Sequence, residues 1–162
     1  MAKIHLTRGK IVYIDDADMP LILGRNWNVF RGGAGGSFYA RTWIHDLTSG
    51  RRRQVQMHRL LLAGISRVDH KDGDGLNNRR SNLRPATSAQ NQANQRSMRG
   101  SSSRFKGVHW DTTKGKWRAR IQVDGQDRHL GIFVSEVEAA KAYNQAAAAA
   151  WGEFARLNKI RV

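Results

Sequence analysis

The sequence of 162 residues contains no cysteine, few acidic residues and no long apolar run. The absence of cysteine excludes disulfide bonds, thiolate zinc sites and cysteine nucleophiles. Apolar stretches such as residues 60–65 are too short to span a bilayer. Basic side chains at positions 3, 8 and 10 interrupt the region where a signal peptide would need an apolar core. We therefore expect a cytoplasmic protein with no membrane partner.

The scarcity of acidic residues gives the first indication of function. The chain has 28 Lys and Arg against 13 Asp and Glu, a formal charge of +15. Basic side chains bind polyanions because phosphate contacts release condensed counterions. Both halves share the excess, with 17 basic and 7 acidic residues before Gly100 and 11 and 6 after it. Because no basic amphipathic helix for a membrane surface is evident, nucleic acid is the expected partner.

The first half of the chain reads as short strands joined by turns. Strand signals occur at residues 4–6 and 10–14 around the turn Arg8-Gly9, and a short helix is expected through Leu23. Its predicted N-terminal caps are Asp15, Asp16 and Asp18. Further strands are predicted at residues 27–30, 38–43 and 55–58, with a glycine-rich turn at 32–36 and a short helix at 59–63.

Residues 66–98 follow the order strand, polar loop, strand, helix. Pro85 disfavours a helical conformation at Arg84, so the piece before it is extended. Thr87 with Gln90 forms a possible capping box, which opens a helix predicted to run to about Met98. Asp72 and Asp74 fit turn positions better than a calcium loop, because an EF-hand would need an acid and a Glu at its two ends.

This segment resembles the phage homing endonucleases of the HNH family, whose site is a ββα-metal hairpin. The resemblance is carried by Asp69-His70, Asn77-Asn78, Asn82-Leu83-Arg84 and Asn91, and by the upstream run Met57-His58-Arg59-Leu60. It implies that His70 is the general base, that Asn82 braces the hairpin and orients His70, and that Asp69 and Asn91 hold one divalent cation, Mg²⁺ or Mn²⁺. His58 is a further candidate, either packed behind the site or touching phosphate.

The chemistry of these residue types agrees with the resemblance. Phosphodiester hydrolysis needs a deprotonated water, and an imidazole is well suited to accept that proton near neutral pH. It also needs charge neutralisation at the phosphate, which a hard cation on oxygen ligands supplies. Oxygen donors favour Mg²⁺ or Mn²⁺ over zinc. Asn91 stands where the prototype of the family carries His, which weakens the argument for a transition metal.

The second half is predicted to form three strands and a helix. Residues 117–123 alternate strictly, with Trp117 and Ile121 on one face and Arg118 and Arg120 on the other. Asp124-Gly125 is a hairpin signal. Ser135 with Glu138 predicts a capping box for an alanine-rich helix that runs to about Trp151 and is ended by Gly152. Such a helix would cover one sheet face and leave the arginines exposed.

This order and spacing resemble the Apetala-type (plant ethylene-response factor) DNA-binding domain. The resemblance covers nearly all of residues 104–158 and includes Trp117-Arg-Ala-Arg120 and Leu157-Asn158. It implies that the sheet contacts DNA in the major groove. The implied DNA-binding residues are Lys106, His109, Arg118, Arg120 and His129. Trp117 and Tyr143 are expected in the core, with the place of Trp110 left open.

Taken together, these features predict an α+β protein that acts on double-stranded DNA as a metal-dependent HNH endonuclease of the homing type, by nicking or by double-strand cleavage. We expect a nuclease domain at residues 1–98, with a β-rich lead-in at 1–57 and the ββα-metal motif at about 66–98. A linker at 99–103 and a DNA-binding domain at 104–162 would follow. We expect a monomer in the cytoplasm of a bacterial or phage-infected cell. The alternative is a non-catalytic DNA-binding protein that retains only the HNH scaffold.

Overall fold

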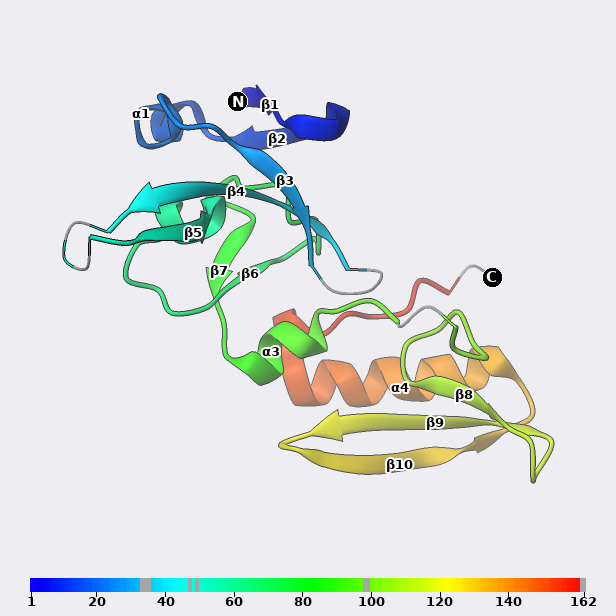
Figure 1. Ribbon diagram of the computed structural model, residues 1–162. Coiled ribbons are helices and arrows are strands. Elements are labelled where there is room, and N and C mark those ends of the chain that lie inside the picture. The colour runs from blue at the N-terminus through cyan, green and yellow to red at the C-terminus, as the bar shows by residue number, and fades with distance from the viewer. Residues whose placement is uncertain (33–35, 47, 49, 98–99, 161–162) are drawn as a thin grey trace. The chain divides into compact units, whose positions relative to one another are not determined.

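The computed structural model describes residues 1–32, 36–46, 48, 50–97 and 100–160. The chain divides into two compact units, Met1–Ala86 and Thr87–Val162, each described here by itself. Small antiparallel sheets and a few helices make up both units, so the predicted α+β class is confirmed (Figure 1). Among the described residues, no helix has the length and apolarity needed to cross a bilayer.

The first unit opens with a β-hairpin followed by two short helical turns. Strands β1 and β2 pair antiparallel across a 3-10 turn, as the sequence predicts. The expected capping by the acidic cluster is wrong, because neither helical turn has a side-chain cap. The Asp18 carboxylate instead accepts hydrogen bonds from the guanidinium of Arg80, and Asp15 accepts one from its backbone N–H. The elements are β1 (Ala2–His5), β2 (Ile11–Ile14), η2 (Asp16–Asp18) and α1 (Met19–Ile22).

A three-stranded antiparallel sheet in the order β3-β4-β5 follows, and β5 leads directly into helix α2. One face of this sheet is buried through Val29, Ala40 and Val55. The predicted strand at 55–58 is too long, because Met57 and His58 already belong to α2. The turn expected at 32–36 lies partly outside the described residues. The elements are β3 (Asn28–Arg31), β4 (Phe38–His45), β5 (Arg52–Gln56) and α2 (Met57–Leu61).

The last hairpin of the first unit consists of β6 (Val68–His70) and β7 (Leu83–Pro85). The chain between them is anchored on β2. There the N–H of Tyr13 donates to the carbonyl of Leu76, and the N–H of Asn78 donates to the carbonyl of Tyr13. Apolar side chains from β2, α1, α2 and β6 form one buried cluster around this hairpin. The N-terminal strands therefore hold the loop between β6 and β7 in place.

The second unit begins with α3 (Ser88–Ala93). Its capping box is confirmed, because Thr87 accepts from the N–H of Gln90 and the Gln90 side chain accepts from the N–H of Thr87. The helix ends at Ala93, earlier than the predicted end near Met98, a residue outside the described range. Asn94 is buried there, and its N–H bonds to the carbonyls of Gln90 and Gln92, which closes the last turn.

The rest of the second unit is a three-stranded antiparallel sheet with one long helix against it (Figure 1). Ala119 and Ile121 face the helix and are buried, and Tyr143 of the helix is buried with them. Asp124 and Gly125 both have positive φ, as the predicted tight hairpin turn requires. The elements are β8 (Val108–Asp111), β9 (Lys116–Val123), β10 (Gln126–Phe133), α4 (Glu136–Trp151) and η3 (Gly152–Phe154).

Two details of this unit refine the sequence expectations. Ser135 caps α4 through the N–H of Val137, and not through the capping-box bond predicted at Glu138. Trp117 is half-buried against the core, and Trp110 packs edge-on against it at 5.0 Å between ring centroids while 40% of its surface stays exposed. Trp110, whose place the sequence left open, therefore lies at the rim of the core.

Candidate active site

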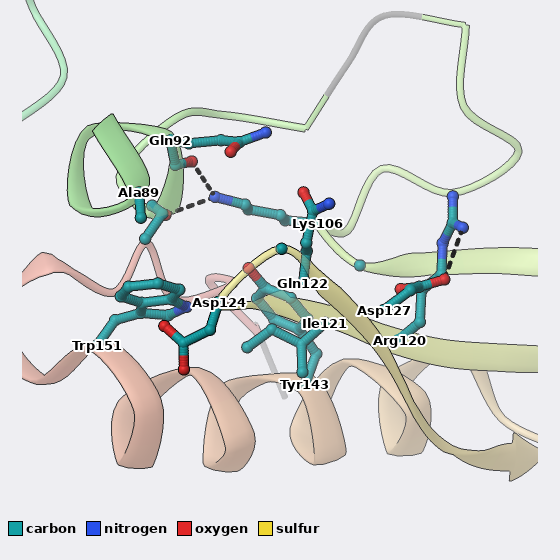
Figure 2. Close-up of a pocket in the computed structure, with 13 residues that line it drawn as sticks. Ala89, Gln92, Lys106, Arg120, Ile121, Gln122, Asp124, Asp127, Tyr143 and Trp151 are labelled. Atoms are coloured by element: carbon teal, nitrogen blue, oxygen red, sulfur yellow. Dashed lines mark hydrogen bonds and ion pairs between the residues drawn. The ribbon is translucent and has the colours of Figure 1, made fainter. Parts of the chain in front are cut away.

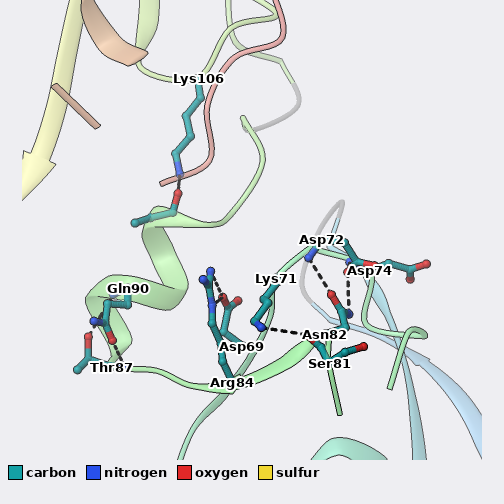
Figure 3. A network of polar contacts seen from close by, with 11 residues as sticks. Asp69, Lys71, Asp72, Asp74, Ser81, Asn82, Arg84, Thr87, Gln90 and Lys106 are labelled. Carbon is teal, nitrogen blue, oxygen red and sulfur yellow. Dashed lines mark hydrogen bonds and ion pairs between the residues drawn. The ribbon is translucent and has the colours of Figure 1, made fainter. Parts of the chain in front are cut away.

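The β6–β7 hairpin places a buried ion pair beside the candidate general base. Asp69 and Arg84 stand opposite each other in the register, and both are buried. Nε and one terminal nitrogen of Arg84 lie 2.9 and 2.8 Å from the same Asp69 oxygen (Figure 3). A buried carboxylate needs such a partner to remain charged. Arg84 therefore fixes the position of Asp69 and balances its charge.

The loop after His70 is held by a network of Asx turns and amide bonds. The carboxylate of Asp72 accepts from the N–H of Asp74, and that of Asp74 accepts from the N–H of Leu76. The turn interpretation of these two aspartates is therefore confirmed. Asn82 closes the loop, because its amide donates to Asp72 Oδ1 at 3.0 Å and to the carbonyl of Asn77 at 2.8 Å (Figure 3). These bonds brace the loop, but the side chain that meets the His70 ring is Asn78 and not, as expected, Asn82.

The orientation of His70 depends on Asn78. Asn78 is fully buried, and its Nδ2 donates to the carbonyl of Gly75. Its Oδ1 is therefore the atom that faces His70 Nε2, at 3.3 Å. Because an amide oxygen only accepts, Nε2 carries the proton and Nδ1 is left as the basic nitrogen. Burial lowers the pKa of His70, which favours the neutral, proton-accepting form at neutral pH.

Two aromatic rings pack around His70 from other elements. The His58 ring of α2 stands edge-on to His70 with 5.0 Å between centroids, and Tyr39 of β4 lies 5.8 Å from it. His58 is buried, so the structure places it behind His70 rather than on an open surface. Burial, and then the nearby charges of His70 and Arg59, lower the pKa of His58 to about 3. In the folded protein, the His58 ring is therefore neutral at neutral pH.

The depressed pKa of His58 makes the stability of the first unit sensitive to acid. Between the ordinary histidine pKa of about 6.5 and the folded value of about 3, the unfolded chain binds more protons. The free energy of unfolding should therefore fall as the pH drops through this window, by up to about 1.4 kcal/mol per pH unit. In urea titrations at several pH values, the free energy of unfolding of H58F should depend less steeply on pH than that of the wild type. H5F, at an exposed strand position, should keep the pH dependence of the wild type. Equal slopes for H58F and wild type would contradict the assignment.

Gly75 brings the loop into direct contact with β4. A Cβ at this position would lie 2.4 Å from the carbonyl oxygen of Phe38 and 2.4 Å from the ring of Tyr39. These distances are far below van der Waals contact, so only glycine allows the approach. Tyr39 therefore contacts the loop at Gly75 as well as the two histidine rings, and it links β4 to the site.

The second candidate metal ligand, Asn91, belongs to the other unit. It lies half-buried on α3, and its N–H donates to the carbonyl of Thr87 in the first turn. Helix α3 packs within the second unit, where the N–H of Arg156 bonds to the carbonyl of Ala93. Among the described residues, no group of three or more His, Asp or Glu side chains is arranged to hold a metal ion.

Lys106 occupies a place that the sequence does not suggest. Its ammonium donates to the carbonyls of Gln92 and Ala93 at the C-terminal end of α3 (Figures 2 and 3). Its backbone is held on both sides by the Asn158 side chain. Burial, and then the charge of Arg156, lower the pKa of Lys106 to about 8. In this structure Lys106 caps α3, a cation at a helix C-terminus.

The other four candidate DNA-binding residues lie on one face of the β8–β10 sheet. His109 stands opposite Arg118, and His129 stands opposite Arg120. This face is the one directed away from α4, because the alternate residues of β9 are buried. Each arginine has an acidic neighbour. Arg118 pairs with Asp111 at 2.8 Å, and Arg120 pairs with Asp127 at 3.1 Å.

The sequence patterns did not predict the roles of three residues of the site. Arg84 is the ion-pair partner of Asp69, Asn78 sets the tautomer of His70, and Tyr39 packs on both histidines. A signal for Arg84 existed, since a charged residue inside a short strand before Pro85 requires a partner. Tyr39 had none, because its contact depends on how β4 meets the loop.

Comparisons with known proteins give matches to HNH endonucleases. Residues 66–93 match the HNH endonuclease family. This HNH segment contains Asp69, His70, Asn82 and Asn91. An uncharacterised HNH endonuclease of Acanthamoeba polyphaga mimivirus is 35% identical over 115 residues, which is 66% of this chain and 59% of the viral protein. Protein 3.8 of Escherichia phage T7 is 28% identical over 82 residues, 49% of this chain and 68% of the phage protein. The HNH segment and the mimivirus relative support a nuclease-type function.

Proposed function

We propose that the protein is a divalent-metal-dependent DNA endonuclease of the homing type, with a DNA-recognition sheet in its second unit. One observation carries the proposal: within the HNH segment, the side-chain oxygen of the buried Asn78 lies 3.3 Å from Nε2 of His70. A fixed neutral imidazole beside a buried carboxylate is suited to activate water against a phosphodiester. The related viral protein is itself described as an HNH endonuclease.

His70 would accept the proton of the attacking water at Nδ1. The bond from Nε2 to Asn78 then stabilises the imidazolium that forms, because Oδ1 of Asn78 accepts a hydrogen bond from Nε2–H in both states. Asn82 and Asp72 keep the loop from shifting during this step. His58 and Tyr39 restrict the ring from behind and exclude bulk water from that side.

Asp69 and Asn91 would hold the divalent cation. A carboxylate and an amide offer oxygen donors only, which fits Mg²⁺ or Mn²⁺ and leaves coordination positions for water and phosphate oxygens. When bound, such a cation neutralises charge on the scissile phosphate and the leaving oxygen. Arg84 holds Asp69 in position, and the capping box of α3 orders the turn that precedes Asn91.

The outward face of the β8–β10 sheet would read double-stranded DNA, with the chain acting as a monomer. His109, Arg118, Arg120 and His129 share this face, and a narrow antiparallel sheet fits the major groove. Arg118 and Arg120 would exchange their aspartate partners for phosphate or base acceptors. We assign no DNA contact to Lys106, since its ammonium is bonded within the unit.

Replacement of Arg118 by alanine should weaken DNA binding and lower the slope of log affinity against log salt by about 1 if it contacts phosphate. The matched control is R128A, which removes the same charge from β10 at a position opposite the buried Ile121. Binding of a fluorescent duplex at several salt concentrations measures both effects. Equal losses of DNA affinity in R118A and R128A would show that this face does not contact the DNA.

The decisive experiment for the nuclease proposal is plasmid nicking. Supercoiled plasmid is incubated with the full chain in Mg²⁺, in Mn²⁺ and in EDTA, and the relaxed and linear forms are separated on a gel. Relaxation or linearisation in either metal and none in EDTA is the expected result. If the plasmid stays supercoiled in both metals while the protein still binds DNA, the nuclease proposal is wrong and the protein is a DNA-binding protein with an HNH scaffold.

A further inference from the structure

The face of the β3–β5 sheet that is directed away from the core of the first unit is basic and aromatic. We call it the outer face, formed by side chains that alternate with the buried ones. Trp43 is 50% exposed there, and Arg52 is exposed beside it. The three strands contain no acidic residue. The outer face comprises Asn28, Phe30, Tyr39, Arg41, Trp43, His45, Arg52, Gln54 and Gln56.

The arginines of the outer face are stacked on aromatic rings. The Arg41 guanidinium lies 4.6 Å from the Phe30 ring centroid, and that of Arg52 lies 5.7 Å from the Trp43 centroid. Arg41 also donates to the amide oxygen of Gln54 at 3.0 Å. Stacking fixes a guanidinium while its N–H edges stay available for an anion. The β8–β10 face differs, because both of its arginines already pair with aspartates.

The outer face is continuous with the candidate active site. Tyr39 stands on the same side of β4 as Arg41 and Trp43, since the three alternate along one strand. At its end of the strand, Tyr39 packs on the rings of His58 and His70. From Tyr39 to Trp43 the strand advances by about 13 Å, the rise of about four base pairs. A duplex with its phosphate at His70 therefore has further phosphates within reach of this face.

We propose that the outer face of the β3–β5 sheet is a second DNA-contacting surface, which binds the backbone of the duplex beside the scissile phosphate. Arg52 and Arg41 would contact phosphates, and Trp43 would pack against the sugar backbone. This inference rests on the proposed nuclease function for its position next to the cut. Charge complementarity and the absence of acidic side chains in the three strands select a polyanion over a protein partner.

Adjacent arginines on β5 provide a matched test. Arg52 belongs to the outer face, whereas Arg53 alternates to the other side and lies 4.0 Å from Asp46. Full-length R52A and R53A lose the same charge at neighbouring exposed positions. Binding of a fluorescent duplex of random sequence is measured in EDTA over a range of salt concentrations. R52A should bind more weakly than R53A, with a salt slope lower by about 1.

The charge-reversal pair R52E and R53E repeats the comparison with a larger expected difference, and thermal unfolding of each variant verifies the fold. Equal affinities and slopes within both pairs would overturn the inference. Because binding is read in EDTA, this result is independent of cleavage. Where the wild type nicks plasmid, at least one phosphate within about four base pairs of the mapped cut should impair wild-type binding when it is ethylated but no longer impair the binding of R52A. Equal interference in both would count against the assigned position.

Discussion

Replacing His70 by alanine should lower the rate of plasmid nicking by roughly 10²–10⁴-fold, the usual contribution of a general base. DNA affinity should stay near that of the wild type, because His70 is 5% exposed and offers little surface to the duplex. The physical reason is the fixed Nε2–H···Oδ1 bond to Asn78, which leaves Nδ1 as the proton acceptor. Single-turnover nicking with enzyme in excess separates this loss from changes in binding.

The control for this variant is H5A, an exposed histidine at the end of β1 in the same unit. H5A should nick at the wild-type rate. A second variant, N78A, should retain the imidazole but lose the bond that sets its tautomer, and we expect an intermediate rate. Parallel losses of binding and nicking in H70A would argue that this histidine supports the DNA surface rather than the chemical step.

Replacing Arg84 by alanine should destabilise the first unit by about 3–5 kcal/mol, because it leaves the buried Asp69 carboxylate without its cation. The ion pair is nearly inaccessible, with 8% and 5% of the two side chains exposed. Urea unfolding followed by tryptophan fluorescence measures the loss. The exposed Arg53–Asp46 pair of the same unit is the control, and R53A should change stability by at most about 1 kcal/mol.

A double variant distinguishes an unpaired charge from a simple loss of packing. Combining R84M with D69L removes both charges at similar volume and should recover much of the stability lost in R84A. The same double variant should be unable to nick DNA if Asp69 holds the cation. R84A and R53A with the same unfolding free energy would show that the Asp69–Arg84 pair contributes little.

Local sequence signals anticipated the elements whose causes lie within a few residues. The capping box at Thr87 and the tight turn at Asp124-Gly125 depend on neighbouring side chains and on φ, and both formed as predicted. The alternation along β9 depends on burial of one face, which the apolar residues already indicated. The length of α3 could not be predicted from such local signals, because the end of the helix depends on the buried Asn94.

The parts that sequence patterns did not anticipate depend on pairing between distant segments. The acidic residues before α1 look like helix caps, yet Asp18 binds Arg80, 62 positions away. Lys106 looks like a DNA contact, yet its ammonium donates to carbonyls at the end of α3. The pairing of Asp69 with Arg84 requires the register of β6 and β7. Long-range register and packing decide these partners, and short motifs do not encode them.

Gly75 limits how this protein can be altered by laboratory evolution. Any side chain there would have to displace the Phe38 carbonyl and the Tyr39 ring, and Tyr39 would carry that displacement to both histidines. Libraries that diversify the loop to alter cleavage are therefore best built with codon 75 kept constant.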